Sequence, residues 1–209
     1  MTLDVLGLLA ACSYALDCVE AELVHVTNNH SKRVAYMSVC IAKQMGIQEE
    51  SLQDLAVCAL LHDNALTQYI QEELHNDISQ IAVTQEVPKL GAHCIWGEKN
   101  VAELPFHTDV SDVILYHHEN ADGSGPFGKK WDEIPLFSRI IHLCDLLDIA
   151  CRTKKFAEGT WKVAEQFVQN STGTMFDREC RDAFLRAFSE EQFLSLDRET
   201  FEDQLWKMV

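Results

Sequence analysis

The stretch HHENADGSGPFG, residues 117–128, places two adjacent histidines and a glutamate immediately before a loop. Three glycines and one proline in its second half prevent a helix from continuing, because glycine favours other backbone conformations and proline lacks the N–H that a helix needs. The residues before it, 109–118, carry apolar positions at helical spacing, so a helix is predicted there. The two imidazoles are therefore expected at a helix C-terminus that faces a loop.

Outside this stretch the chain is predicted to be all-α. Only four prolines and nine glycines occur among 209 residues, and apolar residues recur at helical rather than alternating spacing. The helices are expected at residues 3–25, 28–45, 50–62, 67–80, 88–104, 109–118, 134–152, 160–170 and 176–188.

We expect three parts along the chain. Residues 1–25 are predicted to form an N-terminal helix that packs on the domain or pairs with another copy. Residues 26–156 are predicted to form the main helical bundle. Residues 157–209 are expected to be a helical extension packed on it, whose phenylalanines serve the core or a dimer contact.

Composition excludes several classes of function. A formal net charge of −16 argues against a grip on duplex nucleic acid, because its phosphate backbone is bound through Lys and Arg. No run of 18 apolar residues exists and the first helix lacks a basic flank, so neither a membrane span nor a signal peptide is predicted. The eight cysteines are scattered without CxxC pairs, which favours reduced thiols and a cytoplasmic protein.

Polar side chains of metal-binding type interrupt the apolar stripes of five predicted helices. Burying one polar group without a partner costs about 2–7 kcal/mol, so several on inward faces need a common explanation. One or two divalent metal ions would supply it. The seven positions are His30, His62, Asp63, His93, His117, His118 and Asp145.

Four other histidines form a contrast set. His25, His75, His107 and His142 lie off these stripes or in loop-like or terminal positions. They are expected to be surface or capping residues, and no metal role is assigned to them.

With these residues in hand, the sequence resembles the HD-GYP branch of the HD superfamily of metal-dependent phosphohydrolases over about residues 26–156. Five segments match family motifs in the same order, and this is far more specific than an isolated His-Asp pair. Besides the opening stretch, they are HSKRVAYMSVCIAKQMGI (30–47), LAVCALLHD (55–63), LGAHCIWGEKNVAEL (90–104) and IPLFSRIIHLCDLLDIA (134–150).

The resemblance implies a dinuclear phosphodiesterase that hydrolyses cyclic di-GMP to linear pGpG or GMP. Family members use two or three iron or manganese ions in a helical bundle. By position, the resemblance implies that His62 and Asp63 belong to the catalytic centre and that a metal-bridging hydroxide attacks phosphorus. It also implies two ligand sets that share Asp63: His30, His62, Asp63 and Asp145 for one ion, and Asp63, His93, His117 and His118 for the other.

The chain departs from the family pattern at four places. Val26 replaces a Glu found in three-metal members, so two metal ions are predicted. Leu66 replaces a lysine that meets substrate phosphate, and Lys154 stands where an Arg is usual. The name-giving Gly-Tyr-Pro is here Gly125-Pro126-Phe127, which keeps loop-forming residues but loses the tyrosine hydroxyl at that position.

Substrate contacts are predicted around the glycine-rich loop. Phe127 is expected either to stack on a base or to pack within the loop, and Lys129 and Lys130 are expected to be solvated more than phosphate-bound. Glu119 and Asp122 are expected to orient histidine N–H groups or to fix the loop. The full predicted substrate-binding set is Arg33, Lys154, Phe127, Gly123 and Gly125.

Three alternatives remain open at this stage. The losses at Leu66, Pro126 and Lys154 would suit a catalytically weak module that binds metal and nucleotide in signalling. A scaffold resembling the metal-free HDOD proteins is disfavoured by the retained ligands. Another HD hydrolase substrate, such as a nucleotide or a linear dinucleotide, is also compatible. The expected partners are a cyclic dinucleotide and either a second copy of the chain or a separate signalling protein.

Overall fold

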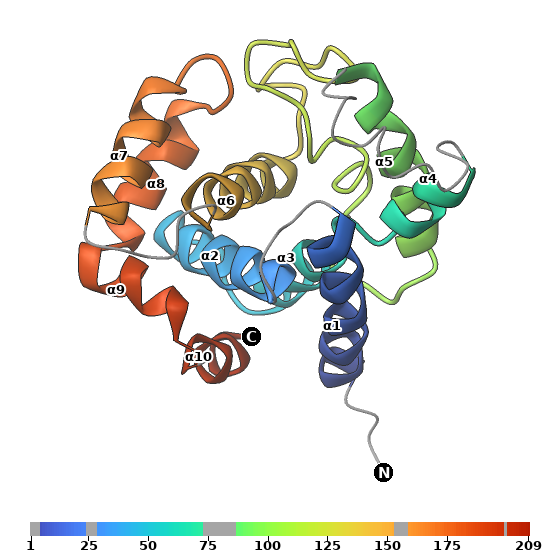
Figure 1. Cartoon of the computed structure of the whole chain (residues 1–209), viewed down its shortest axis with the longest axis horizontal. Helices are drawn as coiled ribbons and strands as arrows, with labels where there is room; N and C mark the ends of the chain where they lie inside the picture. Colours follow the sequence, from blue (N-terminus) through green and yellow to red (C-terminus); the bar gives the residue numbers. More distant parts are fainter. Residues whose placement is uncertain (1–4, 24–28, 73–86, 153–158, 199) are drawn as a thin grey trace.

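The computed structural model describes residues 5–23, 29–72, 87–152, 159–198 and 200–209, which form helices, turns and two isolated β-bridges (Figure 1). The predicted all-α fold is confirmed. The elements are α1 (Val5–Leu23), α2 (His30–Gln44), α3 (Glu50–Leu60), α4 (Leu66–Glu72), α5 (Val87–Val101), α6 (Leu136–Arg152), α7 (Thr160–Asn170), α8 (Arg178–Ala187), α9 (Glu190–Leu194), η2 (Ser195–Asp197) and α10 (Thr200–Met208).

Helix α2 lies at the centre of the bundle. It packs against α1, α3, α6, α8 and α10, so most of its side chains are buried, polar ones included. Val34 and Ile41 on one face of the helix and Val39 on another are all completely buried. Because α2 is buried on several sides, its position in the core also fixes the position of its own first residue, His30.

The C-terminal helices complete the core. Phe176, Phe184, Phe188, Phe193 and Phe201 are all buried within this chain. The rings of Phe184, Phe188 and Phe193 contact one another. Phe188 and Phe201 also contact Tyr36 of α2. Of the two roles predicted for these phenylalanines, the structure shows the core role.

Helix α1 packs on α2 and α3, as predicted for a helix that docks on the domain. The N-cap residue of α2, Asn29, has a left-handed backbone conformation and makes no side-chain capping bond. Asp17 of α1 takes that role, because its buried carboxylate accepts the backbone N–H of Ser31 at 2.9 Å. A carboxylate at this end of a helix also interacts favourably with the helix dipole.

The helix predicted at 109–118 is wrong. The structure has consecutive turns there, with Asp112 at a positive φ of 65°. The carboxylate of Glu98 on α5 accepts the N–H groups of Asp112, Ile114 and Leu115, which removes them from any regular helical pattern. The segment is therefore shaped by a side chain distant in the sequence, which periodicity cannot reveal.

The helix predicted at 50–62 also ends early. Helix α3 stops at Leu60, and His62 and Asp63 lie in the following turn. The Asn64 amide holds this turn on α5, because it donates to the carbonyls of Leu61 and Gly97 at 2.8 and 3.2 Å. Part of the helix predicted at 67–80 lies outside the described residues.

Gly97 permits the close approach that this arrangement needs. A Cβ at this position would lie 2.9 Å from the Ile114 side chain and 3.2 Å from that of Asn64. Contacts this short are sterically unfavourable. The glycine therefore lets α5 meet both the turn after α3 and the turns of 109–118.

Replacing Glu98 by Ala should lower the free energy of unfolding by about 1–3 kcal/mol, because three backbone N–H groups lose their acceptor. Urea denaturation measures the change. Glu103→Ala is the matched control, since Glu103 is exposed and should shift stability by less than about 0.5 kcal/mol. Equal stability of the Glu98 and Glu103 variants would contradict the role given to Glu98.

Candidate metal centre

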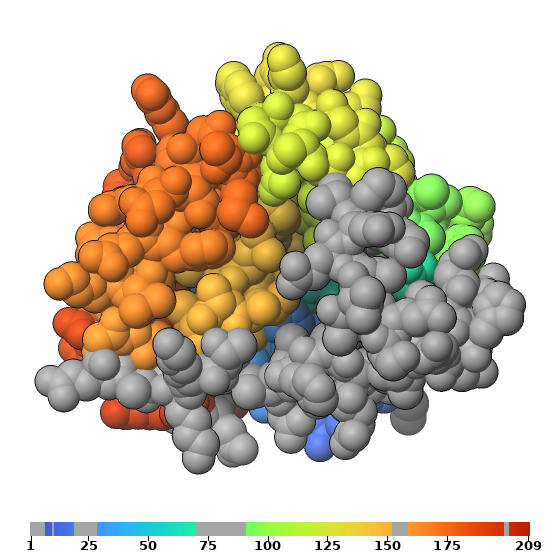
Figure 2. All heavy atoms as spheres, turned by 45° about the horizontal axis from the view of Figure 1, so that its top comes forward, coloured from blue at the N-terminus to red at the C-terminus, as the bar shows by residue number. Residues whose placement is uncertain are grey.

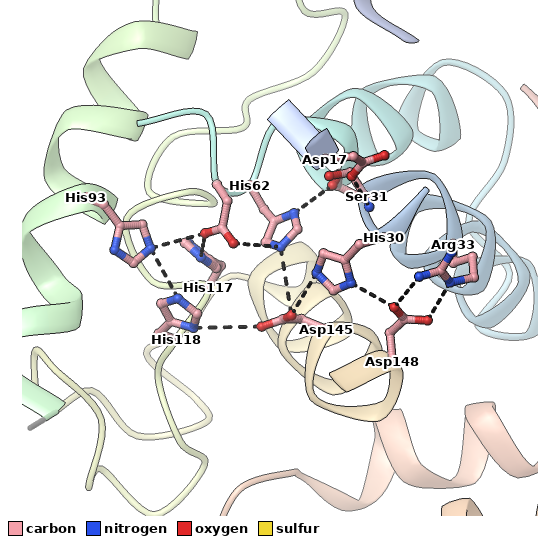
Figure 3. Close-up of polar contacts among 12 residues, drawn as sticks. Asp17, His30, Ser31, Arg33, His62, His93, His117, His118, Asp145 and Asp148 are labelled. Carbon is pink, nitrogen blue, oxygen red and sulfur yellow. Dashed lines mark hydrogen bonds and ion pairs between the residues drawn. The ribbon is translucent and has the colours of Figure 1, made fainter. Parts of the chain in front are cut away.

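A first group of donor atoms comes from α2, α6 and the turn after α3 (Figure 3). His30 Nε2 lies 3.2 Å from Asp145 Oδ1, and His62 Nε2 lies 3.9 Å from the same oxygen. All three side chains are almost completely buried. One donor atom from each lies within 4.8 Å of the others, which is close enough for all three to bind one ion.

A second group comes from α5 and the turns before residue 119. His93 Nε2 and His118 Nε2 face each other at 3.2 Å, and the His117 ring lies beside both. Cys94 Sγ belongs to the same cluster, 3.7 Å from His93 Nε2. The three histidines were predicted from the sequence as metal ligands, but the cysteine was not.

Asp63 lies between the two groups. Its Oδ2 is 3.4 Å from His62 Nε2 in the first group. Its Oδ1 is 3.2 Å from His93 Nε2 and 3.4 Å from His117 Nε2 in the second. The carboxylate thus turns one oxygen toward each group, which is the arrangement of a bridging ligand. The structure therefore brings all seven sequence-predicted metal residues together.

Hydrogen bonds at the far side of the rings determine which nitrogen faces the centre. The Nδ1 of His62 is 2.9 Å from the Ala59 carbonyl, and that of His117 is 2.6 Å from the Ile114 carbonyl. Since a carbonyl only accepts, each Nδ1 must carry the proton. Neutral rings of this tautomer present the unprotonated Nε2 inward, as a metal ligand requires.

Four inward-facing atoms make no hydrogen bond although they are buried. They are His62 Nε2, Asp63 Oδ1, His117 Nε2 and Asp145 Oδ1. Leaving buried nitrogen lone pairs and carboxylate oxygens uncompensated is costly, and cations are the partners that nitrogen and oxygen donors share. The residues present therefore fit bound divalent metal ions.

The Asp63 carboxylate and the buried rings have shifted pKa values. Burial alone would raise the pKa of Asp63, but the adjacent His62, His117 and His93 hold it well below its usual value. Burial and the neighbouring His117 and His93 lower the pKa of His118 far below its usual value. Asp63 is therefore an anion and His118 a neutral imidazole, the protonation states of metal ligands. Against the effect of burial, the hydrogen bond to Asp63 raises the pKa of His93 to about 9, so a bound metal ion would displace a proton there.

Asp148 is a residue of the centre that the sequence analysis missed. Its Oδ2 accepts from His30 Nδ1 at 2.8 Å, which turns His30 Nε2 toward Asp145. Burial alone would raise the pKa of Asp148, but Arg33 and His30 hold it far below its usual value. A sequence signal existed, because Asp145 and Asp148 share the three-residue spacing of His30 and Arg33, so each pair lies on one helix face.

The phosphate contact predicted for Arg33 is not supported. Arg33 is 2% exposed, and its Nε and Nη2 donate to the two oxygens of Asp148 at 2.7 and 2.8 Å. A guanidinium buried in a two-point pair has no surface to offer a phosphate. Arg33 instead positions Asp148, and through it His30.

The residues singled out in the loop 119–128, both the predicted substrate contacts and Glu119, mainly shape that loop. The buried carboxylate of Glu119 accepts the N–H groups of Phe127 and Lys129. A Cβ on Gly125 would lie 2.6–2.8 Å from Glu119 and Asn120, so only glycine fits there. The ring of Phe127 packs edge-on against Tyr116. Of the two roles expected for Phe127, stacking on a base or packing within the loop, this contact corresponds to packing.

The rest of the loop is held by short-range bonds. Asp122 accepts the N–H of Ser124 and is exposed, so it fixes the loop rather than orienting a histidine. Gly123 has a positive φ of 87°, which glycine tolerates without strain. Backbone bonds from Ala121 and Asp122 to Met175 and Thr174 join the loop to the α7–α8 turn, and the two segments lie side by side on the face in Figure 2.

The contrast histidines divide into three cases. His107 is exposed, as predicted. His142 is not a surface residue: it is 4% exposed, it hydrogen-bonds Asn120 at 3.0 Å, and burial lowers its pKa to about 4. Its predicted place on the surface was wrong because α6 is covered on that side by Phe176. His25 and His75 lie outside the described residues, as do Val26 and Lys154.

This fold and these donor groups define a helical metal-binding domain of the HD type. The HD domain family matches residues 16–180, from within α1 into α8, and the chain belongs to that family. Together with the curated relatives described next, this match confirms the resemblance to the HD-GYP branch. Membership in this family implies divalent metal binding.

Curated relatives agree with this placement. The chain is 28% identical over 166 residues, 77% of its length, to the cyclic di-GMP phosphodiesterase response regulator RpfG of Xanthomonas campestris. It is 30% identical over 173 residues, 78% of its length, to a 3'3'-cGAMP-specific phosphodiesterase of Vibrio cholerae. The chain spans only 43% and 35% of these two proteins.

A solved structure shares the fold. A cyclic GMP-AMP-specific phosphodiesterase of Vibrio cholerae superposes with a TM-score of 0.77 at 21% identity, over 97% of this chain and 53% of that one.

Among the described residues, none of the helices has the length and apolar character needed to cross a membrane.

Replacing Asp148 by Asn should weaken metal binding by about 10–100-fold, because the partner that orients His30 and neutralises Arg33 is impaired. Titration of the apo protein with Mn(II) measures the affinity, and circular dichroism confirms that the variant is folded. Arg33→Lys is a milder second variant that keeps the charge but loses the two-point pair. Asp132→Asn, at an exposed position, is the control. Unchanged affinity in both folded variants would contradict the positioning role.

Proposed function

We propose that this chain is a metal-dependent phosphodiesterase that hydrolyses a cyclic dinucleotide, with cyclic di-GMP as the leading candidate. One observation carries the proposal: two groups of buried donor atoms share the carboxylate of Asp63, which turns one oxygen to each. Two cations about 3.5–4 Å apart, bridged by an anion, are a recurrent arrangement in enzymes that cleave phosphate esters.

The proposed centre holds two divalent ions, iron or manganese. His30, His62, Asp63 and Asp145 would hold one, and Asp63, His93, His117 and His118 the other. When bound, such ions supply Lewis acidity, which lowers the pKa of water and offsets negative charge on a phosphodiester. In a protein with a net charge of −16, this centre would also provide the positive potential that attracts an anionic substrate.

The chain's own residues prepare this chemistry. His62 and His117 are locked by carbonyls with Nε2 inward, so they need no reorganisation to bind. Asp63 and Asp145 bring two negative charges among five imidazoles, which limits the net positive charge of the centre. His62 and Asp63 remain the residues that we assign to catalysis.

The relatives' names support a cyclic dinucleotide and leave two forms of it in view. One relative is named for cyclic di-GMP and another for 3'3'-cGAMP. Both substrates present two phosphodiesters and at least one guanine. The predicted contacts from Gly123, Gly125, Phe127 and Lys154 belong to this proposal, whereas Arg33 no longer does.

A second candidate, a module that binds nucleotide but turns it over weakly, is favoured by the surroundings of Leu66. Where the family places a lysine, this leucine packs with Tyr69, Ala92 and Trp96 in a small apolar cluster beside the centre. An apolar contact replaces a cation there, so the transition state loses one source of charge stabilisation.

Anaerobically purified protein, loaded with Fe(II) or Mn(II), should convert cyclic di-GMP to linear pGpG or GMP, detected by chromatography and mass spectrometry. His62→Ala should abolish the product and lower the metal content, because a donor to the first ion is lost. His107→Ala, which changes an exposed histidine, is the control and should retain both.

The comparison of substrates separates the candidates. Faster cleavage of 3'3'-cGAMP would change the assigned substrate but leave the reaction class intact. Tight nucleotide binding without product, at two metals per chain, would favour the binding module. Full activity and metal content in His62→Ala would refute the assigned centre.

A further inference from the structure

We propose that Cys94 is a sulfur ligand of the second metal ion, beside His93, His117 and His118. The inference rests on the proposed metal centre and adds a donor to it. Sequence motifs did not indicate this residue, because it follows His93 directly and neighbouring helix positions usually point in different directions.

Distances in the cluster match a shared ion. Nitrogen ligands lie about 2.0–2.1 Å and thiolate sulfur about 2.3 Å from a transition metal such as zinc, so two donors of one ion lie about 3.0–3.6 Å apart. His93 Nε2 is 3.2 Å from His118 Nε2, 3.2 Å from Asp63 Oδ1 and 3.7 Å from Cys94 Sγ. The sulfur is thus close to ligand spacing from His93 and lies within 4.8 Å of a donor nitrogen of His117 and of His118.

Neighbouring atoms point to a ligand at this place. His117 Nε2 and Asp63 Oδ1 are buried, face the cluster and make no hydrogen bond. His93 Nε2 and His118 Nε2 face each other, although at most one of them could donate a proton to the other. Cys94 is completely buried beside them, with its sulfur within 4.8 Å of a donor nitrogen of each histidine.

A sulfur ligand changes which metal the second position prefers. Thiolates are soft donors, and soft donors favour iron, cobalt or zinc over manganese, which suits carboxylate and water. The first group, with two imidazoles and carboxylates, carries no such bias. The two positions are therefore chemically unequal, and the second should select Fe(II) when both iron and manganese are offered.

Cobalt substitution and X-ray absorption test the ligand directly. In Co(II)-loaded protein, a thiolate ligand gives an intense near-ultraviolet charge-transfer band. In Fe(II)-loaded protein, X-ray absorption detects a thiolate ligand as a sulfur shell at about 2.3 Å. Both signals should be present in the wild type and lost in Cys94→Ser. Cys58→Ala is the control, because Cys58 is equally buried but lies in α3 among apolar side chains.

The outcomes separate this inference from the proposed reaction. A wild type with two metals and active hydrolysis, but no sulfur shell, would overturn the ligand role and leave the phosphodiesterase intact. A sulfur signal that depends on Cys94 in a protein without activity would uphold the ligand and refute the reaction. In a competition assay, Cys94→Ser should also bind relatively more Mn(II), and an unchanged Fe(II) to Mn(II) ratio would count against the preference.

Discussion

The Asp63 carboxylate stands between two sets of buried imidazoles, and much of the surrounding fold serves to hold it there. It lies in a turn rather than a helix, so a regular backbone does not fix it. The Asn64 amide ties this turn to α5, and Gly97 lets the two segments approach. Glu98, one residue further on, shapes the turns that carry His117 and His118. Asn64, Gly97 and Glu98 thus hold together the segments that meet at this carboxylate.

On the other side of the centre the constraint is electrostatic. Arg33, Asp148 and His30 form a buried chain of hydrogen bonds that links α2 to α6. Removing either charge would strand the other in a low-dielectric interior, which is far more costly than losing a surface pair. The same pairing that stabilises the helix contact also sets the direction of an imidazole, so stability and ligand geometry are not separable here.

Local periodicity predicted the all-α fold and the seven metal-type side chains, because inward-facing polar residues stand out on an apolar stripe. It failed where distant side chains decide the backbone. The turns of 109–118 depend on Glu98, and the end of α3 depends on contacts made after it. Arg33 was misread because its partner, Asp148, lies 115 residues away. Cys94 went unnoticed because a single buried cysteine in an apolar stretch looks like ordinary core.

The hydrogen bond from the Ser31 N–H to Asp17 couples the position of α1 to the first turn of α2. Ser31 is the direct neighbour of His30, so the first turn of α2 is fastened to a helix that precedes the bundle. Rotating α1 by one residue about its axis would swing the carboxylate away and release that turn. Because Ser31 is bonded directly to His30, a displacement of α1 would reach the centre through one hydrogen bond and one peptide unit.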